Sequence, residues 1–209
     1  MPRRTKQEAL ATRDTILDAA EILFERQGVS RTTLQHIASA AGVTRGAIYW
    51  HFKDKAHLFN TMMIRATMPL EAVLEKAADG ADPLDDIRDW LLGVFRLMAK
   101  DDKARRVFDI ALHKVEYVEE LTEVRDRYLN SYRQWLERVG GRLKTAKRQG
   151  LLRPGVDPAT AALALCALSD GLLRAWLLNQ GSFDLLSVAR RILTANLDAL
   201  RKEERKGAA

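Results

Sequence analysis

The sequence predicts an all-α protein of about nine helices, in which a three-helix unit precedes a larger helical domain. Apolar residues recur with helical spacing along most of the 209 residues, and the sequence shows no strand pattern. Residues 34–55 carry the sharpest local signal, because a glycine turn separates two short helical patterns and charged residues follow. This order is typical of a helix-turn-helix. We therefore expect one domain at residues 1–54 and a second at residues 55–209.

A first helix is expected over residues 8–27. Its apolar positions repeat with helical spacing: Ile16, Ala20, Leu23 and Phe24. Gly28 follows directly, and glycine commonly ends helices because it adopts the left-handed conformation. The helix should therefore stop just before that glycine.

Two shorter helices should follow. Thr32 or Thr33 can cap the second helix, which ends where Gly42 turns the chain. Thr44 can cap the third helix, which spans only about two turns. So short a helix must serve to present side chains from a platform that the first two helices supply.

The later chain continues in helices. Asp54 is placed to cap a fourth helix that begins near Lys55. We expect Pro69 to kink or divide that helix, because proline removes an amide donor. A loop is expected at residues 78–83. Further helices are expected at residues 87–99, 104–118, 121–149, 158–178 and 183–202.

Composition excludes several classes of protein. A hydrophobic content of 47% supports a sizeable core and excludes disorder for most of the chain. The single cysteine, Cys166, excludes an internal disulfide framework and fits a reducing cytoplasm. The N-terminus does not resemble a secretory signal, and the apolar runs look too short or too interrupted to span a bilayer. The net charge of +6 favours polyanionic partners, although this excess is modest.

The outward face of the third helix carries side chains suited to the major groove of DNA. Arg45 can donate two hydrogen bonds to guanine O6 and N7, a contact worth about 1–3 kcal/mol in discrimination. Gly46 and Ala47 lack bulk and allow the backbone to approach the DNA closely. Tyr49 and Trp50 offer flat surfaces to sugar and phosphate. The remaining predicted DNA contacts, mainly to phosphate, are Thr33, Gln35, Thr44, His51, Lys53 and Lys55.

Two alternatives accompany this interpretation. Basic residues near the N-terminus can form an arm that contacts phosphate or the minor groove, or equally a solubilising tail: Arg3, Arg4, Lys6 and Arg13. For residues 34–55 as a whole, the simpler alternative is an ordinary helical hairpin with a charged face. The caps, the turn, the small Ala38 at the helix crossing and the surface aromatics coincide, which favours DNA binding.

The segment Ala41 to Lys55, AGVTRGAIYWHFKDK, resembles the tetracycline-repressor-like (TetR/AcrR) family of bacterial regulators. It is especially similar to the branch that represses multidrug efflux pump operons in Gram-negative bacteria. The similarity continues more thinly at residues 3–9, 113–117, 170–173 and 182–186, and Pro69 departs from the family pattern. The resemblance implies an all-helical homodimer that binds a palindromic operator and leaves it when its second domain binds a small molecule.

The second domain carries candidate residues for both of those implied roles. The helix at 158–178 is apolar over much of its circumference, which suggests burial against a partner subunit or, alternatively, in a monomeric bundle core. The predicted dimer interface is Leu168, Leu172, Trp176, Ile192, Leu193 and Leu200. A cavity for hydrophobic or amphipathic compounds is expected to be lined by Leu91, Val94, Phe95, Phe108, Leu112, His113, Cys166, Ser169, Asp170, Leu173 and Arg174. For Asp170 and Arg174, one turn apart, a plain salt bridge is favoured.

An enzyme is not expected, nor a cofactor or metal ion. His113 and Glu116 share a helical face, but no further ligand cluster accompanies them, and a salt-bridged or capping histidine is favoured. The sequence lacks a glycine-rich phosphate loop, a nucleophile elbow and a paired-cysteine metal motif. The remaining rival is a DNA-binding regulator or activator that responds to no ligand, and its second domain would have a filled core.

Overall fold

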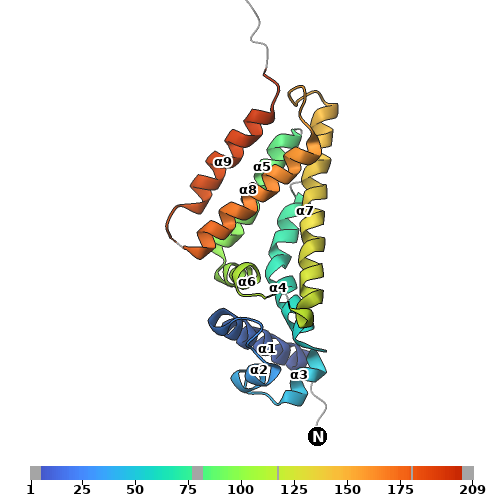
Figure 1. Cartoon of the computed structure of the whole chain (residues 1–209). Coiled ribbons are helices and arrows are strands. Elements are labelled where there is room, and N and C mark those ends of the chain that lie inside the picture. Colours follow the sequence, from blue (N-terminus) through green and yellow to red (C-terminus); the bar gives the residue numbers. More distant parts are fainter. Residues whose placement is uncertain (1–5, 77–81, 117, 180, 204–209) are drawn as a thin grey trace, which may run out of the picture. The chain divides into compact units, whose positions relative to one another are not determined.

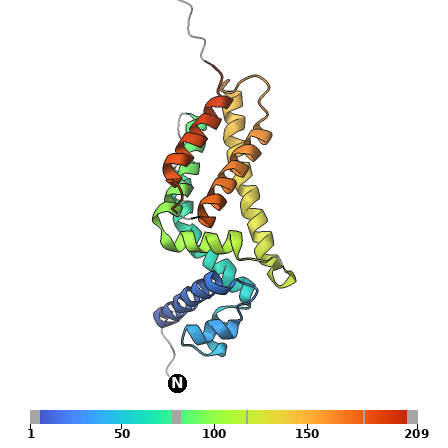
Figure 2. The same cartoon turned by 60° about the vertical axis from the view of Figure 1, so that its left-hand side comes forward.

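The structure, a computed structural model, describes residues 6–76, 82–116, 118–179 and 181–203 of the chain. Within these ranges the fold is all-α, as predicted (Figures 1 and 2), and the extended pairing is limited to an isolated bridge between Leu152 and Arg201. The helices are α1 (Lys6–Gln27), α2 (Leu34–Ala40), α3 (Arg45–His51), α4 (Lys55–Lys76), α5 (Pro83–Lys100), α6 (Asp102–His113), the 3-10 helix η1 (Glu119–Leu121), α7 (Thr122–Arg148), α8 (Pro158–Leu178) and α9 (Leu185–Leu200).

The helices group into two compact units. The N-terminal unit joins residues 1–68 to residues 102–128, and the C-terminal unit joins residues 69–101 to residues 129–209. Helix α6 therefore packs with α1 in the N-terminal unit, although it follows α5 in sequence. The compact N-terminal unit extends beyond residue 54, to residue 68, and also includes residues 102–128. The predicted boundary after residue 54 concerns the DNA-binding domain and stays a prediction.

The N-terminal unit is built around one apolar core. Its fully buried side chains come from every helix of the unit, among them Ile16, Phe24, Ile37, Ile48, Phe52, Phe59 and Ile110. The predicted turns lie where expected, with Gly28 at φ 81° and Gly42 at φ 65°. Ala38 is fully buried, which confirms that a small side chain is used where α2 packs in this unit.

Three predicted boundaries in the middle of the chain are wrong. Helix α4 continues through Pro69 to Lys76, so the proline does not divide it; one lost amide donor is a cost that a long helix can absorb. Helix α5 begins at Pro83, since Asp82 caps it, whereas the rest of the loop predicted at 78–83 lies largely outside the described residues. Helix α6 ends at His113 instead of residue 118.

The early end of α6 has a tertiary cause. The carbonyl oxygen of Lys114, the first residue beyond α6, accepts a hydrogen bond from the Val29 amide at 3.1 Å. Gly28 lies against the same carbonyl, since a Cβ added there would be 3.5 Å from it. The chain after α6 thus leaves the helix to pair with the turn that follows α1.

The C-terminal unit is held by helix packing and by ion pairs at its chain ends. Helix α9 packs against α5 and α8. Arg201, just beyond α9, donates to Asp82 at 2.6 Å and to Asp85 at 2.8 Å. Burial by itself raises the pKa of Asp82, but the hydrogen bonds from Arg201 and from the Leu84 amide outweigh it and lower that pKa. The end of the chain is thereby tied to the start of α5.

Helix α8 is, among the described residues, the one helix long and apolar enough to cross a membrane by length and composition. This differs from the expectation that no run would qualify. The helix packs against α9, buries Leu165 and Cys166, and carries the predicted salt bridge, in which Arg174 Nε lies 2.7 Å from Asp170 Oδ2. Core helices of globular proteins pass the same test of length and composition.

An acidic face of α1 joins it to α4 and α6. Arg65 of α4 lies 2.8 Å from Asp18 and 3.4 Å from Glu21. Arg106 of α6 donates to Glu21 at 2.9 Å, and Lys103 lies 3.1 Å from Asp18. Glu21 is only 2% exposed, so this carboxylate is buried between two guanidinium groups. Burial raises the pKa of Glu21, and the charges of Arg106 and Arg65 offset part of that rise.

Glu21→Ala is expected to lower the free energy of unfolding by about 1–3 kcal/mol, because it removes the buried carboxylate that Arg65 and Arg106 share and leaves them with more exposed carboxylates such as those of Asp18 and Glu25. The control is Glu25→Ala, which removes a half-exposed partner of Arg106 and should cost less than about 1 kcal/mol. Urea unfolding measures both variants. Equal losses would show that burial of the Glu21 pair carries no special weight.

The same residue should impose a pH dependence. Because the pKa of Glu21 is raised on folding, the native state binds its proton more tightly than the unfolded chain. Its contribution to stability therefore falls as pH rises from the ordinary glutamate pKa through the raised value. Glu21→Gln should remove this part of the slope of unfolding free energy against pH.

Candidate nucleic-acid interface

The α2–turn–α3 segment is fixed by local hydrogen bonds and two buried anchors. The Val43 amide donates to the Ala38 carbonyl at 3.0 Å, which closes the turn around Gly42. Ile48 and Phe52 are buried, so the opposite face of α3 is turned to the surface. Helix α3 is thus stabilised by packing of its buried face, because a helix of two turns is not stable by itself.

Both predicted threonine caps are present. Thr44 Oγ1 accepts from the Ala47 amide at 3.2 Å, and Thr33 Oγ1 accepts from the His36 amide at 3.1 Å. His36 has a role that was not predicted: its Nδ1 accepts from the Thr33 amide at 3.4 Å and completes a capping box. The usual signature has glutamate or glutamine at this place, so the histidine gave no signal. Each threonine hydroxyl still has its own hydrogen to donate to a phosphate.

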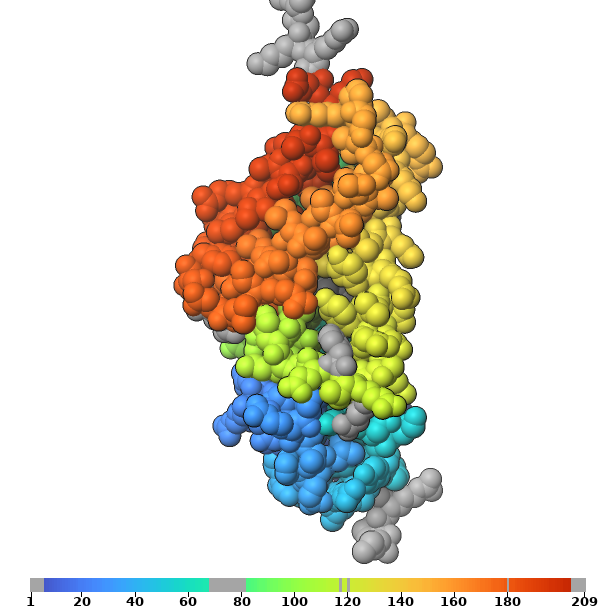
Figure 3. Space-filling model, viewed as in Figure 1, coloured from blue at the N-terminus to red at the C-terminus, as the bar shows by residue number. Residues whose placement is uncertain are grey.

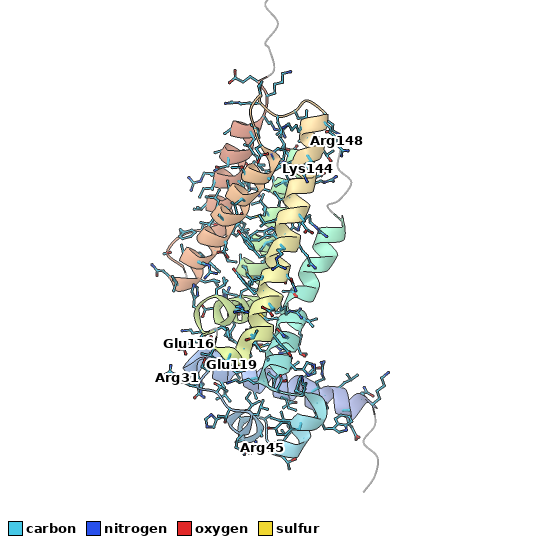
Figure 4. All side chains as sticks on the ribbon, turned by 45° about the vertical axis from the view of Figure 1, so that its right-hand side comes forward. Arg31, Arg45, Glu116, Glu119, Lys144 and Arg148 are labelled. Atoms are coloured by element: carbon cyan, nitrogen blue, oxygen red, sulfur yellow. The ribbon has the colours of Figure 1, made fainter. Side chains whose placement is uncertain are left out.

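Arg45 is held in place along the surface of α3. Its Nη2 donates to the Tyr49 hydroxyl at 3.1 Å, and its guanidinium carbon lies 5.5 Å from the centre of the Tyr49 ring. Figure 4 shows Arg45 at the outer surface of the N-terminal unit. Since a guanidinium has five N–H donors, this arrangement orients the group and leaves donors for a base edge.

Trp50 is the most exposed large apolar side chain on this helix, at 73% of its surface. Its ring meets His51 edge to face, with centroids 4.5 Å apart, and His51 is half-buried like Ala47. The other predicted DNA contacts apart from Lys55 are exposed: Thr33, Gln35, Thr44, Arg45, Gly46, Tyr49 and Lys53. The exposed surface of the α2–α3 segment therefore carries basic, aromatic and hydroxyl-bearing side chains.

Lys55 differs from its predicted role. The residue is only 6% exposed, and its Nζ donates to the carbonyls of Ser30 at 3.3 Å and Thr32 at 3.1 Å. The ammonium group therefore satisfies backbone acceptors ahead of α2. Replacing Lys55 would leave the Ser30 and Thr32 carbonyls without this donor and destabilise the hairpin. A loss of DNA affinity in a Lys55 variant would therefore not by itself demonstrate a contact between Lys55 and phosphate.

The basic N-terminal residues do not all form a tail. Lys6 begins α1, and Arg13 lies within α1 with its guanidinium carbon 5.3 Å from the centre of the Phe52 ring. Arg3 and Arg4 lie outside the described residues. Arg13 is thus part of the folded unit and supports the end of α3 instead of extending as an arm.

The predicted ligand residues divide between the two units. Phe108, Leu112 and His113 belong to α6 in the N-terminal unit, where His113 Nδ1 lies 2.8 Å from Asp109 Oδ1, which confirms a paired histidine. The others belong to the C-terminal unit: Leu91, Val94, Phe95, Cys166, Ser169, Asp170, Leu173 and Arg174. Ser169 Oγ donates to the Leu165 carbonyl at 2.8 Å. Burial raises the pKa of Cys166 to about 12, so this thiol stays protonated.

Two of the predicted dimer residues face the interior of their own chain. Trp176 and Leu193 are buried, because α8 and α9 pack against one another and α9 packs on α5. Leu168, Leu172, Ile192 and Leu200 are half-buried. The most exposed leucines of α8, Leu163 and Leu178, were not among the predicted interface residues. Helical periodicity alone could not tell them from the core leucines, because α8 is apolar almost all round.

Comparisons with known proteins bear on both units. Residues 16–62 match the model of bacterial regulatory proteins of the tetR family, and residues 82–202 match that of the C-terminal region of MAATS-type transcriptional repressors. The transcriptional regulator TtgR of Pseudomonas putida is 40% identical over 203 residues, which are 96% of this chain and 97% of that protein.

Two solved structures are similar over nearly the whole chain. The crystal structure of NalD, the secondary repressor of the MexAB-OprM multidrug efflux pump in Pseudomonas aeruginosa, has a TM-score of 0.87 and 37% identity, and covers 95% of this chain and 100% of that chain. The SmeT–triclosan complex, in which SmeT is the repressor of a Stenotrophomonas maltophilia efflux pump, has a TM-score of 0.79 and 34% identity. It covers 92% of this chain and 93% of that chain.

Gly46→Ala is expected to keep the fold but weaken DNA binding by at least about tenfold, equivalent to about 1.4 kcal/mol. A Cβ at Gly46 would meet only Thr44 Oγ1, at an unstrained 3.9 Å, so nothing inside the unit requires glycine. Alanine also favours the helix by up to about 1 kcal/mol, so thermal stability should not fall. Close approach of the DNA backbone is then the remaining reason for a glycine at this position. Thermal unfolding and titration with labelled operator DNA measure the two effects.

The matched control is Gly141→Ala in α7, where an added Cβ meets nothing within 4 Å and is therefore also unstrained. This variant should gain the same helix propensity and bind DNA as the unchanged protein does. Unchanged DNA affinity of Gly46→Ala would remove Gly46 from the interface.

Proposed function

Because this chain belongs to the tetR family of bacterial regulatory proteins, we propose that it is a ligand-responsive repressor of a multidrug efflux operon. In this proposal a homodimer in the cytoplasm binds a palindromic operator. Hydrophobic or amphipathic compounds bind the C-terminal unit and thereby release the homodimer from the operator. The observation that carries the DNA-binding part is the surface of α3, where Arg45 rests on Tyr49 beside the exposed Trp50.

The efflux operon as target is supported by what the similar proteins regulate. NalD and SmeT are described as repressors of multidrug efflux pumps, and both align over more than nine-tenths of this chain. The α2–α3 hairpin is fully formed in this chain, with both caps, the turn and the outward arginine. We therefore assign the same kind of target here.

A homodimer is supported by the exposed face of α8. That face carries small and apolar side chains that are exposed in the single chain, Leu163, Ala164, Ala167, Gly171, Ala175 and Leu178. Figure 3 shows α8 at the surface of the C-terminal unit. Small residues at helical spacing let two helices approach closely, and a twofold dimer matches a palindromic operator. The half-buried Leu168 and Leu172 border the same face.

Release by a ligand requires different affinities of that ligand for two states of the protein. SmeT has been solved with triclosan, a small aromatic compound, which supports a ligand of this class here. The rival is a regulator without a ligand, and the complete burial of Leu91, Phe95 and Cys166 is the observation in its favour. A direct titration separates the two.

Ala167→Glu is expected to convert the dimer to a monomer, since it places a charge in the centre of the proposed α8 contact. Sedimentation velocity measures the change, and operator affinity should fall with it because half-sites are then bound singly. Gln134→Glu, an exposed position of α7, is the control and should leave the protein dimeric. A dimer that persists in Ala167→Glu would place the interface elsewhere.

Operator release is tested by titrating the protein onto palindromic DNA selected from a random library, with and without antibiotics, dyes and plant phenolics. We expect some of these compounds to lower operator affinity at least about fivefold, the lower range of allosteric coupling. Binding of compounds without any change in DNA affinity would contradict induction and favour the rival.

A further inference from the structure

Two neighbouring tryptophans of the C-terminal unit hold buried, unpaired N–H groups. Trp90 of α5 and Trp135 of α7 meet edge to face, with ring centroids 5.9 Å apart and an interplanar angle of 70°. Trp90 is 7% exposed. In both rings the Nε1 atom is buried and has no hydrogen-bond partner. Two adjacent rings thus each carry an unsatisfied donor.

Such a pair is unusual because an indole nitrogen can only donate a hydrogen bond. Nearly all buried polar groups in native proteins are paired, since an unpaired one loses its hydrogen bonds to water without replacement. An apolar side chain in a core packed to its own shape would not carry this cost. Two unpaired donors on adjacent rings therefore indicate a partner that accepts hydrogen bonds.

The surroundings specify that partner further. Tyr132 packs edge to face against Trp135, with centroids 6.0 Å apart, so three aromatic rings form a continuous cluster. The guanidinium carbon of Arg138 lies 5.9 Å from the centre of the Trp90 ring. Aromatic walls favour a flat aromatic ligand, and the arginine charge favours a neutral or anionic ligand over a cation.

Three polar residues predicted to line the ligand site are already engaged. Ser169 donates to the Leu165 carbonyl, and Arg174 is paired with Asp170. These groups offer a ligand less than the two indoles do, because their hydrogen bonds would first have to be broken.

We propose that Trp90 and Trp135 form the recognition pair for the inducer, and that this inducer is a planar aromatic compound carrying a carbonyl, carboxylate or phenolate oxygen. The proposal rests on the ligand-responsive function proposed above and narrows its ligand class. Indole N–H groups donate to the oxygen of the ligand, while the aromatic cluster supplies apolar contact. Cationic aromatic compounds without an acceptor oxygen bind more weakly.

The test compares 9-fluorenone with fluorene, two flat molecules of nearly the same shape that differ by one carbonyl oxygen. Equilibrium dialysis of the full-length protein measures both dissociation constants. We expect fluorenone to bind about tenfold more tightly, a difference of about 1.4 kcal/mol. In Trp90→Phe and Trp135→Phe, each measured singly, the preference for fluorenone should fall to about threefold or less.

The ratio of the two constants is the readout, because general damage to the fold weakens both probes alike. Trp50→Phe is the matched control, since Trp50 lies on α3 in the N-terminal unit and should leave the ratio unchanged. A ratio near one in the unchanged protein, a ratio that survives both tryptophan substitutions, or no binding of either probe overturns the proposal.

Failure of this proposal is distinguishable from failure of the proposed function. Fluorenone that binds through the two tryptophans without releasing operator DNA would refute induction and leave the recognition pair intact. Operator release by compounds whose affinity is unaffected in Trp90→Phe and Trp135→Phe would uphold induction and refute the pair.

Discussion

The buried carboxylate of Glu21 is the constraint on which the N-terminal unit depends. One face of α1 packs into the apolar core, and the adjacent acidic face meets Arg65 of α4 and Arg106 of α6. Apolar contacts alone tolerate sliding between helices, whereas a buried acid between two guanidinium groups has one favourable geometry. The registers of α4 and α6 against α1 are therefore coupled. Because α2 and α3 pack on the same core, the position of the DNA-binding surface depends on that coupling.

Connectivity makes this coupling relevant to induction. Helix α4 crosses from one compact unit into the other between Met68 and Pro69, and α6 follows directly on α5. The chain crosses a third time within α7, between residues 128 and 129. Of the three connections, those through α4 and α6 lead to the arginines that contact Glu21, so in the proposed mechanism a ligand of the C-terminal unit acts on α1 through them. The continuity of α4 through Pro69 matters here, since a broken helix would transmit less of any displacement.

Much of the recognition hairpin could be predicted from sequence because it depends on neighbours in the chain. Thr33, Thr44 and Asp54 accept hydrogen bonds from amides three residues ahead, and Gly42 supplies a left-handed turn. The roles of Lys55 and Glu21 could not be predicted, because each is set by groups from distant elements. The burial of Trp176 and Leu193 escaped prediction for another reason: an apolar helix surface looks the same whether its own chain or a partner covers it.

The tryptophans show how departures from ordinary burial mark functional surfaces. Trp50, which would contribute most to stability if buried, is 73% exposed on α3 beside Arg45. In the C-terminal unit Trp90 is buried and Trp135 half-buried, yet the buried Nε1 atom of each finds no partner. Each arrangement costs the free protein stability, through exposed apolar area in one case and lost hydrogen bonds in the other. In the function and the ligand site proposed above, binding of DNA at the first surface and of an acceptor-bearing aromatic compound at the second would offset these costs. The two exceptions thus fall in the two units whose occupancy the proposed repressor must couple.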